Sequence, residues 1–185
     1  MINVTDLRKN VTFEWDGQLW RVLEYEHYKP GRGNAIIRTK LRNLRTGGTV
    51  DRNFLSGERV QDVRLDHKTV QYLYTDGDLY YFMDTETFEQ PALDAKTLGD
   101  AVNYLKEGVT LELESYEGEP ISIELPTTVD MVVTDAPMAI AGDTATGATK
   151  SVTTETGLKV TVPLFVNEGD TIRVDTRTGA YLTRV

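Results

Sequence analysis

Alternation of apolar and polar residues with a period of two is the feature that most constrains this chain. In residues 34–43, Ala35, Ile37, Thr39 and Leu41 alternate with more polar neighbours. The same alternation recurs in "TVQYLY", "LYYFMD", "VTLELES", "ISIEL", "KVTVPLF" and "TIRVDT", with glycine-containing turns such as "TDGD" and "NEGD" in between. Successive side chains of a strand point to opposite faces, so this pattern predicts β-strands. Many short strands with glycine turns favour an all-β fold of small barrels or sandwiches.

One segment has a helical period instead. In residues 94–108, Leu98, Ala101, Val102 and Leu105 fall at i, i+3, i+4 and i+7. That spacing places them on one face of a helix, which we expect to end at Gly108.

The chain length allows one large domain or two to three small ones, and a weak internal repeat favours a modular chain. The sequence has 185 residues, and "TET" occurs both at 85–87 and at 154–156, a weak internal repeat. We expect domains at 1–64, 65–127 and 128–185, each small enough to need its neighbours for stability.

Charge divides the chain unevenly. The formal net charge is -9, but residues 1–63 carry a net +3 and residues 64–185 a net -12. Such asymmetry suggests that the first part meets a polyanion while the remainder avoids one. Between Lys29 and Arg52 there are seven cations and a single anion, Asp51.

Several classes of function find no support in the residues. The sequence has no cysteine, and His27 and His67 have no metal-binding spacing, so we expect no metal, no cofactor and no nucleophile triad. No apolar run approaches the roughly 20 residues of a membrane span, and the first residues lack a signal peptide's apolar core. We expect a soluble cytoplasmic protein that is not an enzyme and makes no membrane contact.

Three cations follow one face of a predicted hairpin strand. If residues 34–43 form a strand, then Arg38, Lys40 and Arg42 lie on one face, each about 6.6 Å from the next. That step is close to the spacing of phosphates along a nucleic-acid strand, so the row could hold an RNA backbone. It could equally be a solvated face whose charges protect a sheet edge.

The connection of this hairpin, "KPGRG", isolates one arginine. Pro30 fixes its own φ, whereas Gly31 and Gly33 can take positive φ, so no neighbouring β-carbon shields Arg32. A guanidinium offers five donors and a flat face for phosphate, ribose or base. The turn is either a plain surface turn or the functional tip of the molecule, formed by Arg32 with Lys29, Pro30, Gly31, Gly33 and Asn34.

The chain resembles the bacterial translation elongation factor P family over essentially its whole length. "LWRVLEYEHYKPGRGNAIIRTKLRNLRTGG" is similar to that family's first domain, with "PGRGNA" at its hairpin tip. "KSVTTETGLKVTVPLFVNEG" is similar to its C-terminal signature, with Val152 where alanine is usual. Matching signature positions are Lys150, Gly157, Val160, Val162, Pro163, Val166 and Gly169.

The resemblance implies an SH3-like (KOW-like) barrel followed by two OB-fold barrels in an L-shaped, tRNA-like outline. It also implies a monomer that binds both ribosomal subunits between the peptidyl-tRNA and exit sites. There it would relieve stalling at consecutive prolines by positioning the CCA end of peptidyl-tRNA. Arg32 would make the tip contact, and Arg38, Lys40 and Arg42 would hold the acceptor backbone.

The resemblance leaves the chemical state of Arg32 open. Many relatives carry a lysine here, extended by β-lysylation in some of them, and another branch carries an arginine modified by a rhamnosyltransferase. The Pro-Gly-Arg-Gly frame lies between the two patterns, and we favour a bare arginine. Weaker RNA contacts are implied toward the exit-site codon and tRNA at Gly142, Asp143, Thr144, Gly147, Tyr181 and Arg184.

Two alternatives come from other classes. The same barrels could form a generic single-stranded RNA-binding module, which stacks bases on aromatic side chains. Its aromatic candidates, however, lie in an acidic region poor in Lys and Arg: Tyr72, Tyr74, Tyr80, Tyr81 and Phe82. An enzyme with a carboxylate site is the second alternative, and no constellation of residues supports it.

Overall fold

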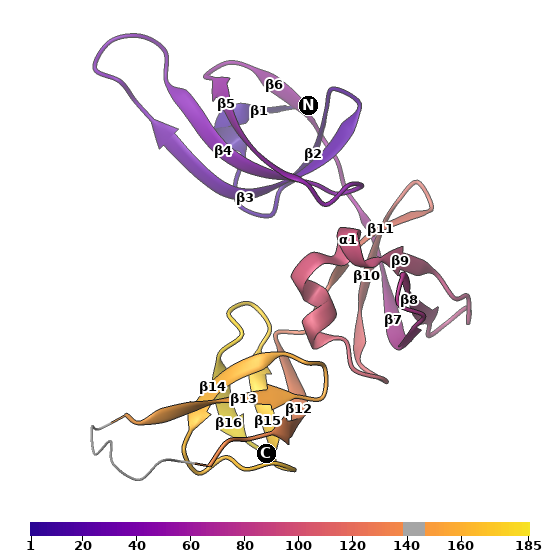
Figure 1. The fold of residues 1–185 in the computed structure, drawn as a ribbon. Coiled ribbons are helices and arrows are strands. Elements are labelled where there is room, and N and C mark those ends of the chain that lie inside the picture. The colour runs from indigo at the N-terminus through magenta and orange to yellow at the C-terminus, as the bar shows by residue number, and fades with distance from the viewer. Residues whose placement is uncertain (139–146) are drawn as a thin grey trace. The chain divides into compact units, whose positions relative to one another are not determined.

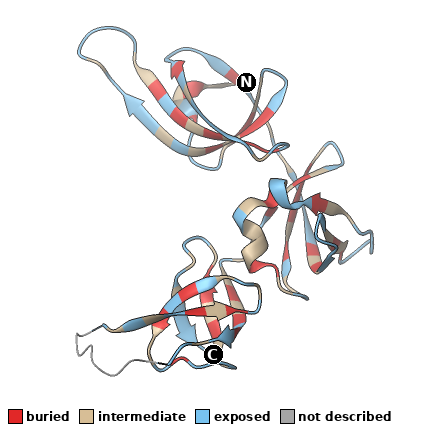
Figure 2. Ribbon diagram, viewed as in Figure 1, coloured by how far each residue is buried: buried red, intermediate tan, exposed pale blue. Residues whose placement is uncertain are grey.

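The computed structural model describes residues 1–138 and 147–185, and this part of the chain is all-β (Figure 1). Three sheets follow one another along the sequence. Within each, the residues of one face are buried and the turns between strands are exposed (Figure 2). The alternation therefore predicted the fold class correctly.

The N-terminal sheet has six strands and forms a small barrel. In spatial order they are β1 (Ile2–Asn3), β6 (Arg59–Asp62), β2 (Thr12–Trp15), β3 (Gln18–Tyr28), β4 (Ile36–Asn43) and β5 (Thr49–Leu55), with the 3₁₀ turn η1 (Val4–Asp6) after β1. Only residues 56–58 join β5 to β6, so the two sides of the sheet come together. Apolar side chains fill the interior, with Phe13 edge-on to Phe54 at a centroid distance of 6.2 Å.

A β-bulge in β3 changes which residues face the barrel interior. Val22 pairs with Leu41, whereas Glu24 pairs with Lys40, so the register shifts at Leu23. Strict alternation would put Glu24 on the same face as the fully buried Val22. Because of the bulge, β3 beyond it presents Glu24 and Glu26 to solvent instead.

The other two sheets have five strands each. The central sheet contains β11 (Glu119–Glu124), β10 (Thr110–Tyr116), β7 (Asp66–Thr75), β8 (Leu79–Asp84) and β9 (Ala92–Asp94). The C-terminal sheet contains β14 (Lys159–Pro163), β13 (Thr149–Thr154), β12 (Thr128–Asp135), β15 (Thr171–Asp175) and β16 (Tyr181–Arg184), and its two edge strands approach each other. The sheets end and begin near the expected domain seams, which stay predictions.

The predicted helix is only partly correct. Residues 95–98 form the short helix α1 (Ala95–Leu98), capped by the Asp94 carboxylate, which accepts a hydrogen bond from the Thr97 N–H. The chain then breaks at Gly99, whose φ of 57° belongs to the left-handed region, and continues as the 3₁₀ helix η2 (Gly99–Tyr104). Leu98 and Leu105 are buried as the pattern predicted. The short apolar pattern did not distinguish one continuous helix from two short ones.

The described chain forms two compact units. The first contains residues 1–68, 93–99 and 113–122, and the second contains residues 69–92, 100–112 and 123–185. Within the first unit, Leu19 and Leu44 pack with Ile121, and the Arg21 guanidinium forms an ion pair with the Glu114 carboxylate. None of the helices in the described part is long and apolar enough to cross a membrane.

Candidate functional site

The β3–β4 hairpin projects from the N-terminal sheet and ends in the loop 29–35 (Figure 1). The last paired residues are Tyr28 and Ile36. Gly33 has a φ of 100°, which favours glycine, and a β-carbon on Gly31 or Gly33 would meet no atom within 4 Å. Gly31 does not have a positive φ, so the expectation of left-handed backbone holds for Gly33 alone. The loop is therefore open on both sides of Arg32.

Arg32 is exposed at this tip. Within residues 1–138 and 147–185, its guanidinium has no hydrogen bond, ion pair or ring contact. Lys29 and Asn34 are also exposed, and Pro30 is half-buried. All five N–H donors of Arg32 are thus available to an external acceptor, and no internal contact has to be broken first.

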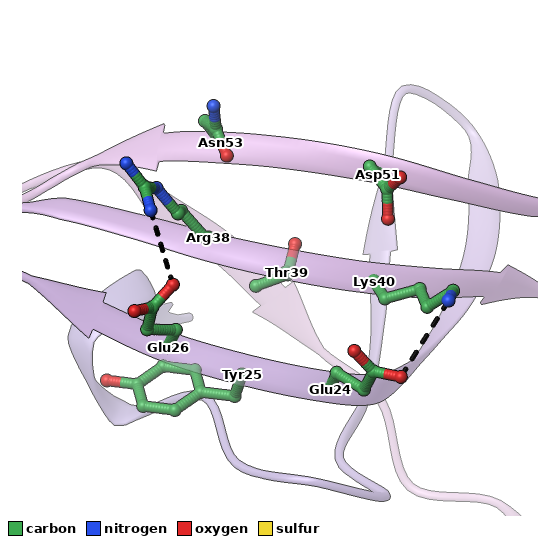
Figure 3. Close-up of a pocket in the computed structure, with 8 residues that line it drawn as sticks. All are labelled: Glu24, Tyr25, Glu26, Arg38, Thr39, Lys40, Asp51 and Asn53. Atoms are coloured by element: carbon green, nitrogen blue, oxygen red, sulfur yellow. Dashed lines mark hydrogen bonds and ion pairs between the residues drawn. The ribbon is translucent and has the colours of Figure 1, made fainter.

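Arg38 and Lys40 lie on the outer face of β4, as predicted, but each has an acidic neighbour on β3. Arg38 Nη1 lies 3.4 Å from Glu26 Oε2, and Lys40 Nζ lies 3.7 Å from Glu24 Oε1 (Figure 3). Both cations are about half exposed, at 50% and 43% of their side-chain surface. Exposed pairs of this kind contribute about 0–1 kcal/mol and exchange readily with other partners.

These residues surround a shallow hollow of about 320 Å³. Figure 3 shows its lining, which consists of Glu24, Tyr25, Glu26, Arg38, Thr39, Lys40, Asp51 and Asn53. Three carboxylates therefore accompany two cations. The hollow is mixed in charge rather than basic, which the cation-rich sequence of β4 did not suggest.

Tyr28 adds a ring beside this row. The Arg38 guanidinium carbon lies 4.4 Å from the Tyr28 ring centroid, so the same side chain pairs with a carboxylate and stacks on an aromatic ring. Neither Tyr28 nor the two glutamates was among the sequence candidates. Their signal was present in the alternation of β3, but reading it required the position of the bulge.

Arg42 differs from the other two cations. It is half-buried, and its Nη2 donates a hydrogen bond to the Thr97 carbonyl oxygen at 3.0 Å. A β-carbon on Gly99 would lie only 2.6 Å from the same Nη2. Arg42 therefore anchors the end of α1, and its guanidinium is less available than that of Arg38.

Only some of the weaker candidates in the C-terminal region lie among the described residues. Gly142, Asp143 and Thr144 lie outside the described residues, whereas Gly147 is exposed with a φ of 101°. Tyr181 is half-buried against the core of the C-terminal sheet. Arg184 has its Nη1 3.6 Å from Asp170 Oδ2 and its guanidinium over the Phe165 ring.

Comparison with solved structures finds matches that include two translation factors of low sequence identity. One is the eukaryotic translation initiation factor 5A from Methanococcus jannaschii, with 21% identity and a TM-score of 0.49, covering 67% of this chain and 93% of that one. The other is a translation initiation factor eIF-5A family protein from Naegleria fowleri, with 14% identity and a TM-score of 0.43, covering 66% and 94%.

Family models give a stronger result, since three consecutive matches span nearly the whole chain. The elongation factor P KOW-like domain matches residues 3–60, its OB domain residues 65–123, and its C-terminal domain residues 129–184. Val152, the departure from the usual signature, is buried in the C-terminal core beside Val160 and Val162, so the larger side chain packs there. The chain belongs to the elongation factor P family of translation factors.

Proposed function

We propose that this chain binds both ribosomal subunits between the peptidyl-tRNA and exit sites and stimulates peptide-bond formation at consecutive prolines. The observation that carries the proposal is the exposed Arg32, which has no partner among the described residues, at the end of a projecting hairpin in a chain of this family. Arg32 contacts the CCA end of peptidyl-tRNA, in the cytoplasm, and the chain acts as a monomer.

The physical problem at such codons is one of geometry. The proline ring locks φ and restricts the residue before it, so a peptidyl chain ending in proline rarely reaches the geometry for attack. A factor that holds the CCA end in place lowers the entropic part of the barrier without acting as an acid or base. A contribution of about 2 kcal/mol corresponds to roughly thirtyfold in rate.

The charge distribution supports a single docking orientation. The RNA-facing hairpin lies in the part of the chain with a net +3, while residues 64–185 carry a net -12 and repel phosphate. On this proposal Arg38 and Lys40 exchange their glutamate partners for acceptor-stem phosphates. Arg42 supports tRNA binding mainly by anchoring the end of α1 and to a smaller extent by contacting the tRNA backbone directly.

A translation assay tests the proposal directly. In a reconstituted system without any elongation factor P, adding this chain should accelerate synthesis across Pro-Pro-Pro by roughly thirtyfold. A matched template with alanines in place of the prolines should show no change. Equal acceleration of both templates, or of neither, would refute the proposed function.

Removing the acidic partners gives a second prediction. Glu24→Gln/Glu26→Gln should raise the affinity of the chain for tRNA about threefold to tenfold, because two repulsive charges beside Arg38 and Lys40 disappear. Arg38→Ala/Lys40→Ala should lower the affinity for tRNA. The slope of log affinity against log salt concentration should also become shallower by about two, because two phosphate contacts are lost.

The matched control is Asp135→Asn/Glu168→Gln, which removes two exposed charges from the C-terminal sheet region. It should leave tRNA affinity within about twofold of the parent. If the control raises affinity as much as the Glu24/Glu26 variant does, only net charge matters and the basic row is not the binding surface.

A further inference from the structure

The β7–β8 hairpin carries two stacked tyrosines beside its turn, the exposed Tyr74 and the half-buried Tyr81. Tyr74 is 54% exposed, and its ring faces that of Tyr81 at a centroid distance of 4.8 Å with an angle of 23° between the planes. The Tyr81 hydroxyl donates a hydrogen bond to Asp76 Oδ2 at 2.9 Å. The elongation-factor proposal gives this pair no role.

A second β-bulge places Tyr74 in solvent. Tyr72 pairs with Phe82 and Tyr74 pairs with Tyr81, so the register shifts at Leu73. Tyr72 is buried, with its ring centroid 5.7 Å from that of Phe82. Without the bulge Tyr74 would share the inward face of Tyr72. Bulges commonly re-aim side chains at functional positions, and here one exposes a large aromatic ring.

The segment that carries the pair is acidic. Residues 69–92 contain five acidic residues and no lysine or arginine. Asp76 Oδ1 accepts hydrogen bonds from the Leu79 and Asp78 N–H groups at 2.8 and 3.0 Å. The bond from Leu79, then those from Tyr81 and Asp78, lower the pKa of the Asp76 carboxyl, so it stays ionised. Asp78 is exposed on the same turn.

We propose that this tyrosine hairpin (Tyr74, Asp76, Asp78 and Tyr81) binds arginine side chains of a protein partner. A guanidinium can stack on the exposed Tyr74 ring and donate to the neighbouring carboxylates at the same time. Phosphate would be repelled, which disfavours RNA at this surface. The proposal is independent of the function proposed for Arg32.

The chain already holds an arginine in this manner elsewhere. In the N-terminal sheet, Arg38 stacks 4.4 Å from the Tyr28 centroid while its Nη1 lies 3.4 Å from a Glu26 oxygen. A tyrosine ring and a carboxylate of one hairpin therefore contact the same guanidinium in this chain. At the tyrosine hairpin the same two groups are present, and no lysine or arginine of residues 69–92 is there to fill them.

Titration of the ¹⁵N-labelled full chain followed by NMR tests the proposal. The probes are the peptide Gly-Arg-Gly-Arg-Gly-Arg-Gly, its lysine counterpart and hexauridylate, at physiological ionic strength. The arginine peptide should shift the amides of residues 74–81 and bind about threefold to tenfold more tightly than the lysine peptide. Tyr74→Ala should abolish that preference and weaken arginine-peptide binding by a similar factor.

Two controls separate a site from general attraction to an acidic protein. Phe88→Ala removes another aromatic ring, 68% exposed, at the opposite end of β8 and should leave binding unchanged. Asp135→Asn/Glu168→Gln removes two charges elsewhere and should also leave binding of the arginine peptide unchanged. The proposal is overturned if these variants weaken binding as much as Tyr74→Ala. It is also overturned if the amide shifts spread evenly over the acidic surface, or if hexauridylate binds the hairpin more tightly than the arginine peptide.

Discussion

Replacing Arg32 by alanine should abolish at least nine-tenths of the stimulation of Pro-Pro-Pro synthesis. A guanidinium hydrogen-bonded to a phosphate or ribose contributes about 1.5–3 kcal/mol, which corresponds to roughly tenfold to a hundredfold in rate. Because Arg32 is exposed and makes no contact within the described part of the chain, the free energy of unfolding should change by less than about 0.5 kcal/mol. The measurements are the reconstituted translation assay and urea unfolding of the same variant.

Two further variants make the result specific. Arg32→Lys keeps the charge but loses the planar fork, so we expect partial activity. Arg59→Ala removes an exposed arginine from β6 of the same sheet and should be fully active. If Arg32→Ala works as well as the parent, the tip is not the functional contact.

Measuring the mass of the intact protein distinguishes a bare Arg32 from a modified one. Protein purified from its natural host should have the mass of the unmodified sequence if the bare guanidinium acts. An increase by one deoxyhexose would show rhamnosylation, and the alanine variant made in the same cells should then lack that increase. The translation assay should use the form that the mass identifies.

The long hairpin could be predicted from the sequence because local rules agree there. Alternation predicted a strand at residues 34–43 and "KPGRG" predicted the connection before it, and β4 begins two residues later than expected and ends at Asn43 as expected. The tip is therefore visible in the sequence. No acid lies between Lys29 and Lys40, so the sequence already excluded a local acidic partner for Arg32, and the described residues add none from elsewhere.

What the sequence could not predict depends on single-residue shifts in register. The bulges at Leu23 and Leu73 turn Glu24 and Tyr74 outward, and no local composition marks either position. The same limit explains the mixed charge around Arg38 and Lys40. Their cross-strand partners lie 12 and 16 residues earlier in the chain, and only the shifted register places them opposite.

Glu114→Gln should destabilise the first unit by about 3 kcal/mol, the largest stability effect that we expect. The Glu114 side chain is 7% exposed and its partner Arg21 is 18% exposed, so the ion pair is largely removed from water. Within the described residues, the buried Arg21 Nε has no hydrogen-bond partner of its own. Removing one member of a buried pair leaves an uncompensated charge, at a cost of about 3–5 kcal/mol.

The neighbouring strand increases this cost. Arg21 pairs directly across the sheet with Arg42, so loss of the Glu114 charge leaves two arginines at opposite positions of β3 and β4 without that carboxylate. Like charges opposite each other on a sheet are destabilising. The Arg42 guanidinium donates a hydrogen bond to the Thr97 carbonyl oxygen, which is neutral, so this bond does not offset the Arg42 charge.

Urea unfolding followed by tryptophan fluorescence measures the effect in the correct part of the chain. Both tryptophans of the sequence, Trp15 and Trp20, lie in the N-terminal sheet and therefore report on the first unit.

Arg21→Met/Glu114→Leu, which removes both charges, should stay within about 1 kcal/mol of the parent. Glu119→Gln breaks the exposed pair with Arg45 and should cost less than about 1 kcal/mol. If Glu114→Gln costs no more than Glu119→Gln, the buried pair does not hold the first unit together. The packing of Leu19 and Leu44 against Ile121 would then be its main support.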